Sequence, residues 1–348
     1  MNGTVEATFS GPRRWFHVAL VLLLVIGVEL TLGTPVWAQE AFPGPAPGAR
    51  AYGMGGAYVA VVSDPSALYW NPAALGEQHL QVYAALGGQN LGQVADLIAL
   101  GQALKDKDTT KLNDLAKEPI DVPLSALAAV GLGPAALGVG AQGVATASST
   151  STSATAEYRL VVPVRAGVGI PVVGIPALGS LRVGAAASYY AGQHYEWTSG
   201  SDPLQNSGSG FGVDLGLKAK LTPWISAGLV AHDVVNTFAW EGEALEPPKP
   251  SFQAGVQVTP PILGLTVAAD VDSQKFLHVG AEYRLLGVLA LRGGYIQPLD
   301  AGAAPSDLAS LRAGVGVGFL VGSVNAGIGF ASDPFQVKDV MVEASVGF

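Results

Sequence analysis

The chain has no cysteine and few charged residues. Among its 348 residues, the absence of cysteine excludes a disulfide framework, a thiol nucleophile and a lipoprotein anchor. Charged residues make up 13% of the chain, and the mean hydropathy of +0.37 is high for a soluble protein. The formal net charge of −9 argues against nucleic acid as a partner, because phosphate binding requires a basic face.

Glycine, in contrast, is abundant, with 46 residues. In the second half of the chain, apolar residues alternate with small or polar residues, with a period of two. In residues 263–272 the odd positions are all apolar, and the even positions carry Gly, Thr, Ala, Asp and Asp. Residues 211–221 and 277–285 alternate in the same way. Successive side chains of a strand point to opposite faces, so each segment has an apolar face and a small or polar face. Soluble antiparallel sheets also alternate, but glycines and charges that share one face over about ten residues are typical of a transmembrane β-barrel.

This pattern predicts an all-β fold, a transmembrane antiparallel β-barrel of about 14 strands. Bacterial single-chain barrels have an even number of strands, and their inner connections are short, as at Gly133-Pro134. The expected strands are residues 78–89, 124–132, 135–147, 157–170, 180–197, 208–220, 223–235, 250–259, 263–272, 276–285, 288–297, 308–319, 323–332 and 339–348.

Two stretches have features of helices. Residues 123–147 carry no charge and are long enough to span a bilayer as a helix. The glycines and Pro134 within them cost a helix about 1 and 3 kcal/mol each, which favours two strands joined by a turn. Residues 93–117, in the first outer connection, repeat apolar residues at helical spacing. They are expected either to pack over the barrel mouth or to form an amphipathic lid that gathers apolar ligands through Val94, Leu97, Ile98 and Leu104.

Residues 1–38 are expected to be a cleaved signal peptide. Arg13 and Arg14 precede an apolar run that is shorter than the roughly 20 residues of a membrane span. Val36 and Ala38 fit the small-residue rule for cleavage. The arginine pair also resembles a twin-arginine signal, but that route carries folded cargo. Because a barrel must cross the inner membrane unfolded, the general secretory route is preferred.

A glycine-rich motif follows the predicted signal peptide. Residues 48–60 read GARAYGMGGAYVA, and residues 64–73 read DPSALYWNPA. These stretches resemble the FadL-like family of outer-membrane barrels, the long-chain fatty-acid transporter group, and look most like its PorV-like and conjugal-transfer TraF-like branches. The resemblance implies a fourteen-stranded barrel at residues 78–348 and a plug at residues 39–77 that folds inside it. The implied plug or gate residues are Arg50, Gly53, Gly55, Gly56, Asn71, Pro72 and Ala73.

The polar faces of the predicted strands supply candidate lumen-lining residues. Unpaired charge is costly there, so ion pairing between strands and with Arg50 of the plug is expected, and a polar route around the plug is the alternative. The candidates are Asp214, Lys218, Lys220, Asp270, Asp272, His278, Glu282, Arg284, Arg292, Arg312, Asn325 and Glu343. Aromatic residues near strand ends are expected in the girdles at the bilayer surfaces, namely Tyr195, Trp197, Trp224, Phe238, Trp240 and Tyr295.

The last predicted strand alternates through Val342, Ala344 and Val346 and ends on Phe348. A terminal aromatic in this register resembles the signal by which the barrel-assembly machinery recognises outer-membrane barrels. Phe348 is therefore a candidate assembly signal. The expected location is the bacterial outer membrane, with its lipid and the assembly machinery as partners.

Passive uptake or transfer of hydrophobic, fatty-acid-like compounds is the leading expectation for function, and it rests on the family resemblance. The alternative is a non-transporting scaffold or shuttle component of a secretion or conjugation apparatus. A continuous apolar pocket that reaches the plug favours transport, and an interior filled with paired charges favours the scaffold.

Enzymatic function is a remote alternative. Outer-membrane phospholipases use a Ser-His-Asn arrangement in the barrel wall, and His232-Asp233 has Asn236 nearby. No serine in a comparable motif accompanies them, and a nucleophile, a base and an orienting group must converge, so no catalytic residue is assigned. No pair of histidines has metal-ligand spacing, so neither a metal nor a cofactor is expected.

Overall fold

In the computed structural model, the described residues belong to one compact unit. The structure describes residues 48–348 except 77–79, 173–178, 243–247, 262–263, 300–309 and 331–336, and the predicted signal peptide lies outside this part. The helical segments are α2 (Ala49–Gly53), α3 (Ala67–Trp70), η2 (Pro72–Ala74), η3 (Leu91–Gln93), α4 (Val94–Lys105) and α5 (Thr109–Leu115). The strands are β1 (Leu80–Gln89), β2 (Ile120–Leu132), β3 (Ala135–Ser149), β4 (Ala154–Val172), β5 (Ser180–Thr198), β6 (Leu204–Thr222), β7 (Ile225–Asn236), β8 (Ala239–Trp240), β9 (Ser251–Val258), β10 (Leu265–Asp272), β11 (Phe276–Leu285), β12 (Leu289–Pro298), β13 (Ser310–Phe319), β14 (Gly322–Phe330) and β15 (Val337–Gly347).

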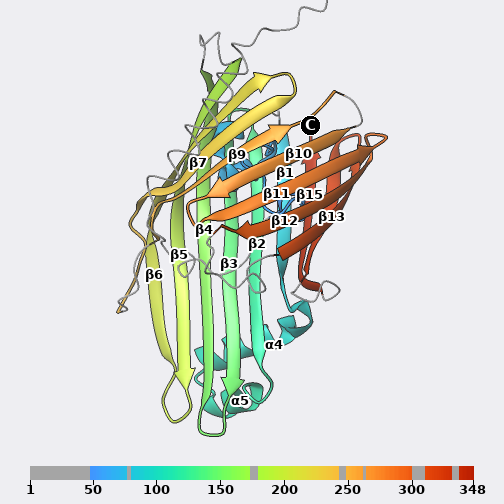
Figure 1. Cartoon of the computed structure of the whole chain (residues 1–348). Helices are drawn as coiled ribbons and strands as arrows, with labels where there is room; N and C mark the ends of the chain where they lie inside the picture. Colours follow the sequence, from blue (N-terminus) through green and yellow to red (C-terminus); the bar gives the residue numbers. More distant parts are fainter. Residues whose placement is uncertain are drawn as a thin grey trace, which may run out of the picture. The chain divides into compact units, whose positions relative to one another are not determined.

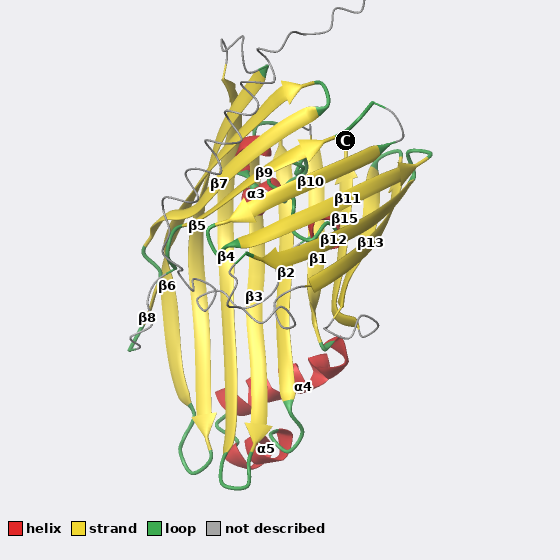
Figure 2. Ribbon diagram, viewed as in Figure 1, coloured by secondary structure: helices red, strands yellow, loops and turns green. Residues whose placement is uncertain are grey.

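Fourteen of these strands form a closed antiparallel ring (Figures 1 and 2). Each pairs with the next along the chain, β7 pairs with β9, and β1 pairs with β15 to close the ring. The two-residue β8 pairs with β6 beyond the end of β7. The prediction of an all-β barrel of about 14 strands is confirmed, with strand bounds that agree to within a few residues.

The two strands favoured over a helix for residues 123–147 are confirmed, because these residues form most of β2 and β3. They turn at Gly133, whose φ of 65° lies in the left-handed region that glycine enters without steric cost. Among the described residues, no helix is long and apolar enough to cross a membrane.

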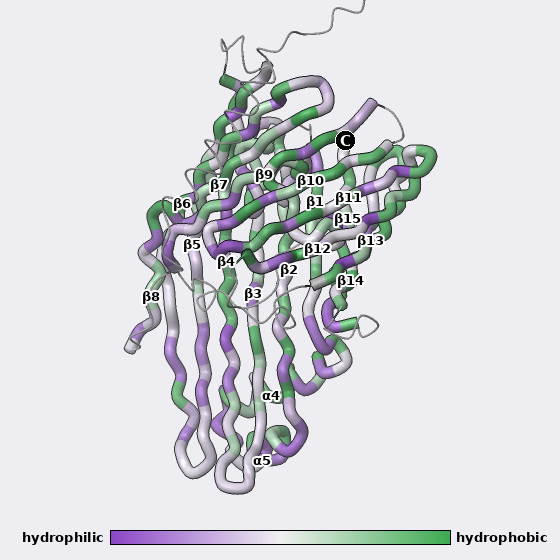
Figure 3. Tube along the Cα trace, viewed as in Figure 1, coloured by the Kyte–Doolittle hydropathy of each residue, from purple (hydrophilic) through white to green (hydrophobic). Residues whose placement is uncertain are grey.

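The two faces of the ring differ in polarity. On β6, Asp214, Gly216 and Lys218 are buried, whereas Leu215 and Leu217 between them are 47% and 41% exposed. Large apolar side chains are exposed in the same alternation along most other strands, and hydropathy changes sign repeatedly along the ring strands (Figure 3). The apolar face points outward and the polar face inward, as in a barrel surrounded by lipid.

The ring has a long side and a short side. Strands β4, β5 and β6 each have 19 residues, whereas strands β9–β15 have 8 to 11. At one end, β2–β6 extend well past the short strands, and α4 and α5 lie beside this extension (Figure 1). The prediction of helices in the first connection is confirmed, because α4 and α5 lie between β1 and β2.

These helices cover the outward side of the long wall rather than the barrel mouth. Leu100 and Leu104 of α4 pack in one cluster with Tyr195 and Trp197 of β5. On β5, the inward-facing buried residues are even-numbered, including Tyr190, so the odd-numbered Tyr195 and Trp197 point outward. The roles of Val94, Leu97, Ile98 and Leu104 as a lid stay a prediction.

Two of the expected girdle aromatics point inward instead. Phe238 and Trp240 form a buried cluster with Val161 and Tyr190. A β-carbon added at Gly192 or Gly208 would meet the Trp240 ring at 2.6 and 2.8 Å, so the aromatic groups lie directly on glycine. The sequence pattern did not indicate this, because Phe238 and Trp240 lie where the ladder between β6 and β7 ends.

Candidate functional site

The N-terminal segment, residues 48–76, is the candidate functional site. Its turn after α2 uses Gly55 and Gly56, with φ of 67° and 80°, a conformation that glycine adopts readily. Asn71 begins the short helix η2: its Oδ1 accepts a hydrogen bond from Ala73 N at 3.1 Å, and Pro72 occupies the first helical position. The segment is almost wholly buried, and it contacts inward-facing residues on both the long and the short side of the ring.

A group of carboxylates on the short side holds the first half of the segment. We call Asp270, Asp272, Glu282 and Glu343 the acidic seat. Arg50 Nε and Nη2 donate to the two oxygens of Glu282 at 2.8 and 2.9 Å. This paired geometry is the strong form of an arginine–carboxylate contact.

The Glu282 carboxylate also accepts from two arginines of the wall. The distances are 2.6 Å from Arg292 Nε and 2.9 Å from Arg284 Nε. Glu282 is 1% exposed, so its charge depends on these three cations for compensation.

The remaining carboxylates of the acidic seat mainly hold backbone groups. Asp270 Oδ2 accepts from Tyr58 N at 2.8 Å and Val59 N at 2.9 Å, and Glu343 accepts from Arg50 N at 3.1 Å. Burial raises the pKa of the Tyr58 hydroxyl well above its usual range, so this group stays a donor, to Asp64 Oδ2 at 3.2 Å.

His278 connects the turn at Gly55 to the wall. Its Nδ1 lies 2.7 Å from Gly55 O, and its Nε2 lies 3.0 Å from Asp272 Oδ2. A carbonyl oxygen only accepts, so Nδ1 carries a proton. The contact with Asp272 then needs a second proton, on Nε2 or on the carboxylate.

Basic side chains on the long side hold the second half of the segment. We call Arg165, Arg182 and Lys218 the basic seat, and each donates to backbone carbonyls. Lys218 Nζ donates to Val62 O at 2.6 Å, Arg165 Nη1 to Leu68 O at 3.3 Å, and Arg182 to the carbonyls of Ala73, Leu75 and Gly169. Several of these carbonyls flank or end short helices, where they lack helical partners and a cation is favourable.

Glycines let the backbone of the segment lie directly on the wall. Gly169, Gly184 and Gly216 are cross-strand neighbours on β4, β5 and β6. A β-carbon at Gly184 would overlap the backbone of Pro72 and Ala73, and one at Gly216 would lie 2.9 Å from Ala73 N. On the short side, Gly280 and Gly294 are paired in the same way beneath Met54 and Gly55.

The histidine considered for catalysis contacts a different acid from its sequence neighbour. His232 Nδ1 lies 3.5 Å from Asp214 Oδ2, which also accepts from Arg165 Nη1 at 3.0 Å. Asn236 Nδ2 donates to Asp233 Oδ1 at 2.7 Å. These contacts connect strands β4, β6 and β7, and the His, Asp and Asn do not form one linear relay.

The other sequence-predicted residues have several different environments. Arg312 lies over the Tyr52 ring, 3.8 Å from its centroid, and Asn325 Nδ2 donates to Glu343 Oε1 at 2.9 Å. Lys220 is exposed, and Phe348 is 75% exposed, with its backbone N donating to Leu80 O at 2.8 Å. The assembly role of Phe348 stays a prediction.

Sequence reasoning missed Arg165 and Arg182, two of the three basic-seat residues. Both lie in predicted strands, and Arg165 shares its parity with Gly167 and Gly169. The grouping of glycine and charge on one face, used for the second half of the chain, therefore also applies to β4.

On the inward face of β1–β3, twelve neighbouring described positions are all uncharged. Tyr69 of the N-terminal segment packs there against Tyr83, Ala85 and Leu127. Leu68 approaches the position of a β-carbon at Gly138 to 3.1 Å. We call this surface the neutral strip: Gln81, Tyr83, Ala85, Gly87, Ser125, Leu127, Ala129, Gly131, Ala136, Gly138, Gly140 and Gln142.

Solved structures share this fold, although no protein-family model and no curated protein matches the chain. The toluene transporter TodX of P. putida is 14% identical, with a TM-score of 0.56 over 86% of this chain and 98% of that one. The CymD monoaromatic hydrocarbon channel is 15% identical, with a TM-score of 0.53 over 88% and 98%. A FadL homologue of Pseudomonas aeruginosa is 11% identical, with a TM-score of 0.56 over 88% and 99%. The chain therefore has the fold of FadL-like outer-membrane barrels.

Proposed function

We propose that this barrel is a channel for hydrophobic compounds, and that the N-terminal segment is its plug. The neutral strip is the observation that carries the proposal. An apolar compound gains nothing from charged groups, and it cannot displace their partners without leaving buried charges uncompensated. The neutral strip is a surface along which such a compound can move without breaking an ion pair.

The likeness to solved structures supports this function by analogy. TodX is described as a toluene transporter and CymD as a monoaromatic hydrocarbon channel. At 14–15% identity their cargo does not transfer to this chain, so the compound remains defined by class.

A scaffold in a secretion or conjugation apparatus is the second candidate, and one observation favours it. The interior contacts of the acidic and basic seats are paired charges and hydrogen bonds, as a permanently closed barrel would have. Under this alternative the N-terminal segment is a structural core that never moves.

The two candidates differ in permeability. Cells that express the barrel should take up the uncharged dye 1-N-phenylnaphthylamine faster than cells without it, because the lipopolysaccharide leaflet otherwise slows apolar entry. Deleting residues 48–76 should increase entry of a small hydrophilic dye while the barrel still assembles, since ring closure leaves no unpaired strand edge. Equal uptake of the apolar dye with and without the intact barrel would rule out transport in favour of the scaffold.

A further inference from the structure

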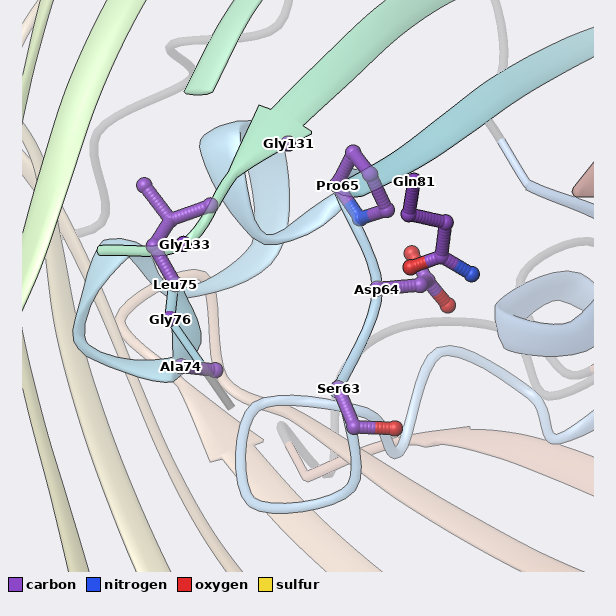
Figure 4. A pocket seen from close by; sticks show the side chains of 9 residues that line it. All are labelled: Ser63, Asp64, Pro65, Ala74, Leu75, Gly76, Gln81, Gly131 and Gly133. Carbon is purple, nitrogen blue, oxygen red and sulfur yellow. The ribbon is translucent and has the colours of Figure 1, made fainter. Parts of the chain in front are cut away.

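A small cavity lies at one end of the neutral strip, at the end of the barrel opposite α4 and α5 (Figures 1 and 4). It separates residues 63–65 and 74–76 of the N-terminal segment from Gln81, Gly131 and Gly133 of the wall. Its volume is about 10 Å³, which is room for one water molecule. In this conformation, passage therefore requires the segment to move away from β1 and β2.

Ser63, Asp64 and Gln81 supply the polar side chains at the cavity. Gln81 is 9% exposed, and its Oε1 has no hydrogen-bond partner among the described residues. The Gln81 side chain points toward the Asp64 carboxylate (Figure 4). Asp64 accepts from Ser66 N at 2.9 Å and Tyr58 Oη at 3.2 Å, and no arginine or lysine is among the residues that line the cavity. An anionic cargo would meet a like charge here.

Residues 63–65, which line the cavity, have weaker attachments to the wall than the parts of the segment held by the two seats. The acidic seat holds Arg50 by an ion pair, and charged donors of the basic seat hold four carbonyls of the segment, of which only Leu75 O belongs to a residue that lines the cavity. At residues 63–65, in contrast, Pro65 Cγ lies 3.2 Å from the position of a β-carbon on Gly131, which is an apolar contact. Regions with few polar attachments open at the lowest free energy.

We infer that this seam, between residues 63–65 and the wall at Gln81 and Gly131, is the outlet of the channel. We further infer that it passes uncharged hydrophobic compounds in preference to fatty-acid anions. The inference rests on the proposed function and adds the exit and the charge of the cargo. The Asp64 carboxylate disfavours an anionic headgroup, and Arg182, the cation beside Gly76, already donates to the carbonyls of Ala73, Leu75 and Gly169.

A disulfide across the seam tests the outlet directly, since the chain has no cysteine of its own. Pro65 Cβ lies 3.9 Å from the position of a β-carbon on Gly131, within the 3.5–4.5 Å range of disulfides. In the double variant Pro65→Cys and Gly131→Cys, oxidation should reduce phenylnaphthylamine entry to the level of cells without the barrel. Reduction of the same cells should restore entry, and each single variant should be insensitive to oxidant.

The outcomes separate the outlet from the function. If the unmodified barrel carries no dye, the proposed function fails. If it carries dye and complete crosslinking, counted by thiol alkylation, leaves entry unchanged, the outlet is elsewhere and the inference fails alone. Where crosslinking is incomplete, Gly131→Phe fills the cavity, and unchanged dye entry through a heat-modifiable, assembled barrel likewise overturns the inference.

Asp64→Asn tests the charge selectivity. The amide can still accept from Ser66 N, so the turn is retained while the charge is lost. Entry of a labelled decanoate should rise relative to entry of phenylnaphthylamine, and Asp64→Glu should keep the original ratio. An unchanged ratio in Asp64→Asn would show that the carboxylate does not select the cargo.

Discussion

The two halves of the N-terminal segment are held by opposite chemistries. Carboxylates of β10, β11 and β15 hold the first half, and what they bind is N–H groups and the Arg50 guanidinium. Cations of β4–β6 hold the second half, and what they bind is carbonyl oxygens. A segment shifted along the wall would place acceptors against carboxylates, so the two seats together allow one position. Position is therefore specified by charge, and glycine only provides the room for close approach.

Glu282→Gln should cause the largest loss, because it removes the common partner of Arg50 and Arg292. Leaving buried arginines uncompensated costs about 3–5 kcal/mol. Protease cleavage within residues 48–76 of the folded barrel, measured against denaturant, should begin at a much lower concentration. Glu196→Gln is the matched control, since Glu196 is 55% exposed and lies at the far end of β5. Equal protection in both variants would mean that the acidic seat does not hold the segment.

Gly184→Val should disturb the other half by steric overlap. The added side chain would occupy the place of the Pro72 and Ala73 backbone, and such overpacking costs about 1–3 kcal/mol. The same protease assay should show cleavage near residues 71–75. Gly293→Val is the control, because a β-carbon there has no atom within 4 Å. If Gly293→Val were as damaging, the cause would be valine in a strand rather than the glycine seat.

Lys218→Met should weaken the basic seat without overlap. It removes the donor to Val62 O, and a lost partner of a buried carbonyl costs about 1–3 kcal/mol. Lys220→Met, two residues along the same face but exposed, should change cleavage little. If the two variants are cleaved at the same urea midpoint, Lys218 does not help to hold the segment.

The smallest expected effect is the coupling between the two seats, measured in the double variant Glu282→Gln with Lys218→Met. This coupling is the difference between the loss in the double variant and the sum of the two single losses. The two side chains share no partner, so the two losses should add to within about 0.5 kcal/mol. A larger coupling, measured as a double-mutant cycle on cleavage midpoints, would show that one seat rearranges when the other is emptied.

The strands were predictable from the sequence because lipid outside and a packed polar interior impose a period of two. Asp214, Asp270 and Glu282 were selected by that parity, and all three are buried. Pairing of the acids with Arg50 was predicted and is observed at Glu282, but which acid it would choose was not predictable, because parity says nothing about what faces a side chain across the ring. The placement of α4 also escaped prediction, because helical periodicity identifies an apolar face but not which face of the wall covers it.

The ring closes between its first and last strands, β1 and β15. Contacts so distant in sequence form late and slowly, because the intervening chain loses the most entropy when they meet. The first half of the N-terminal segment binds β10, β11 and β15, which are synthesised long after the segment. Arg50 and the backbone donors of the segment therefore stay without these partners until the last strand, β15, is in place, so the segment reaches its final position only when the ring closes.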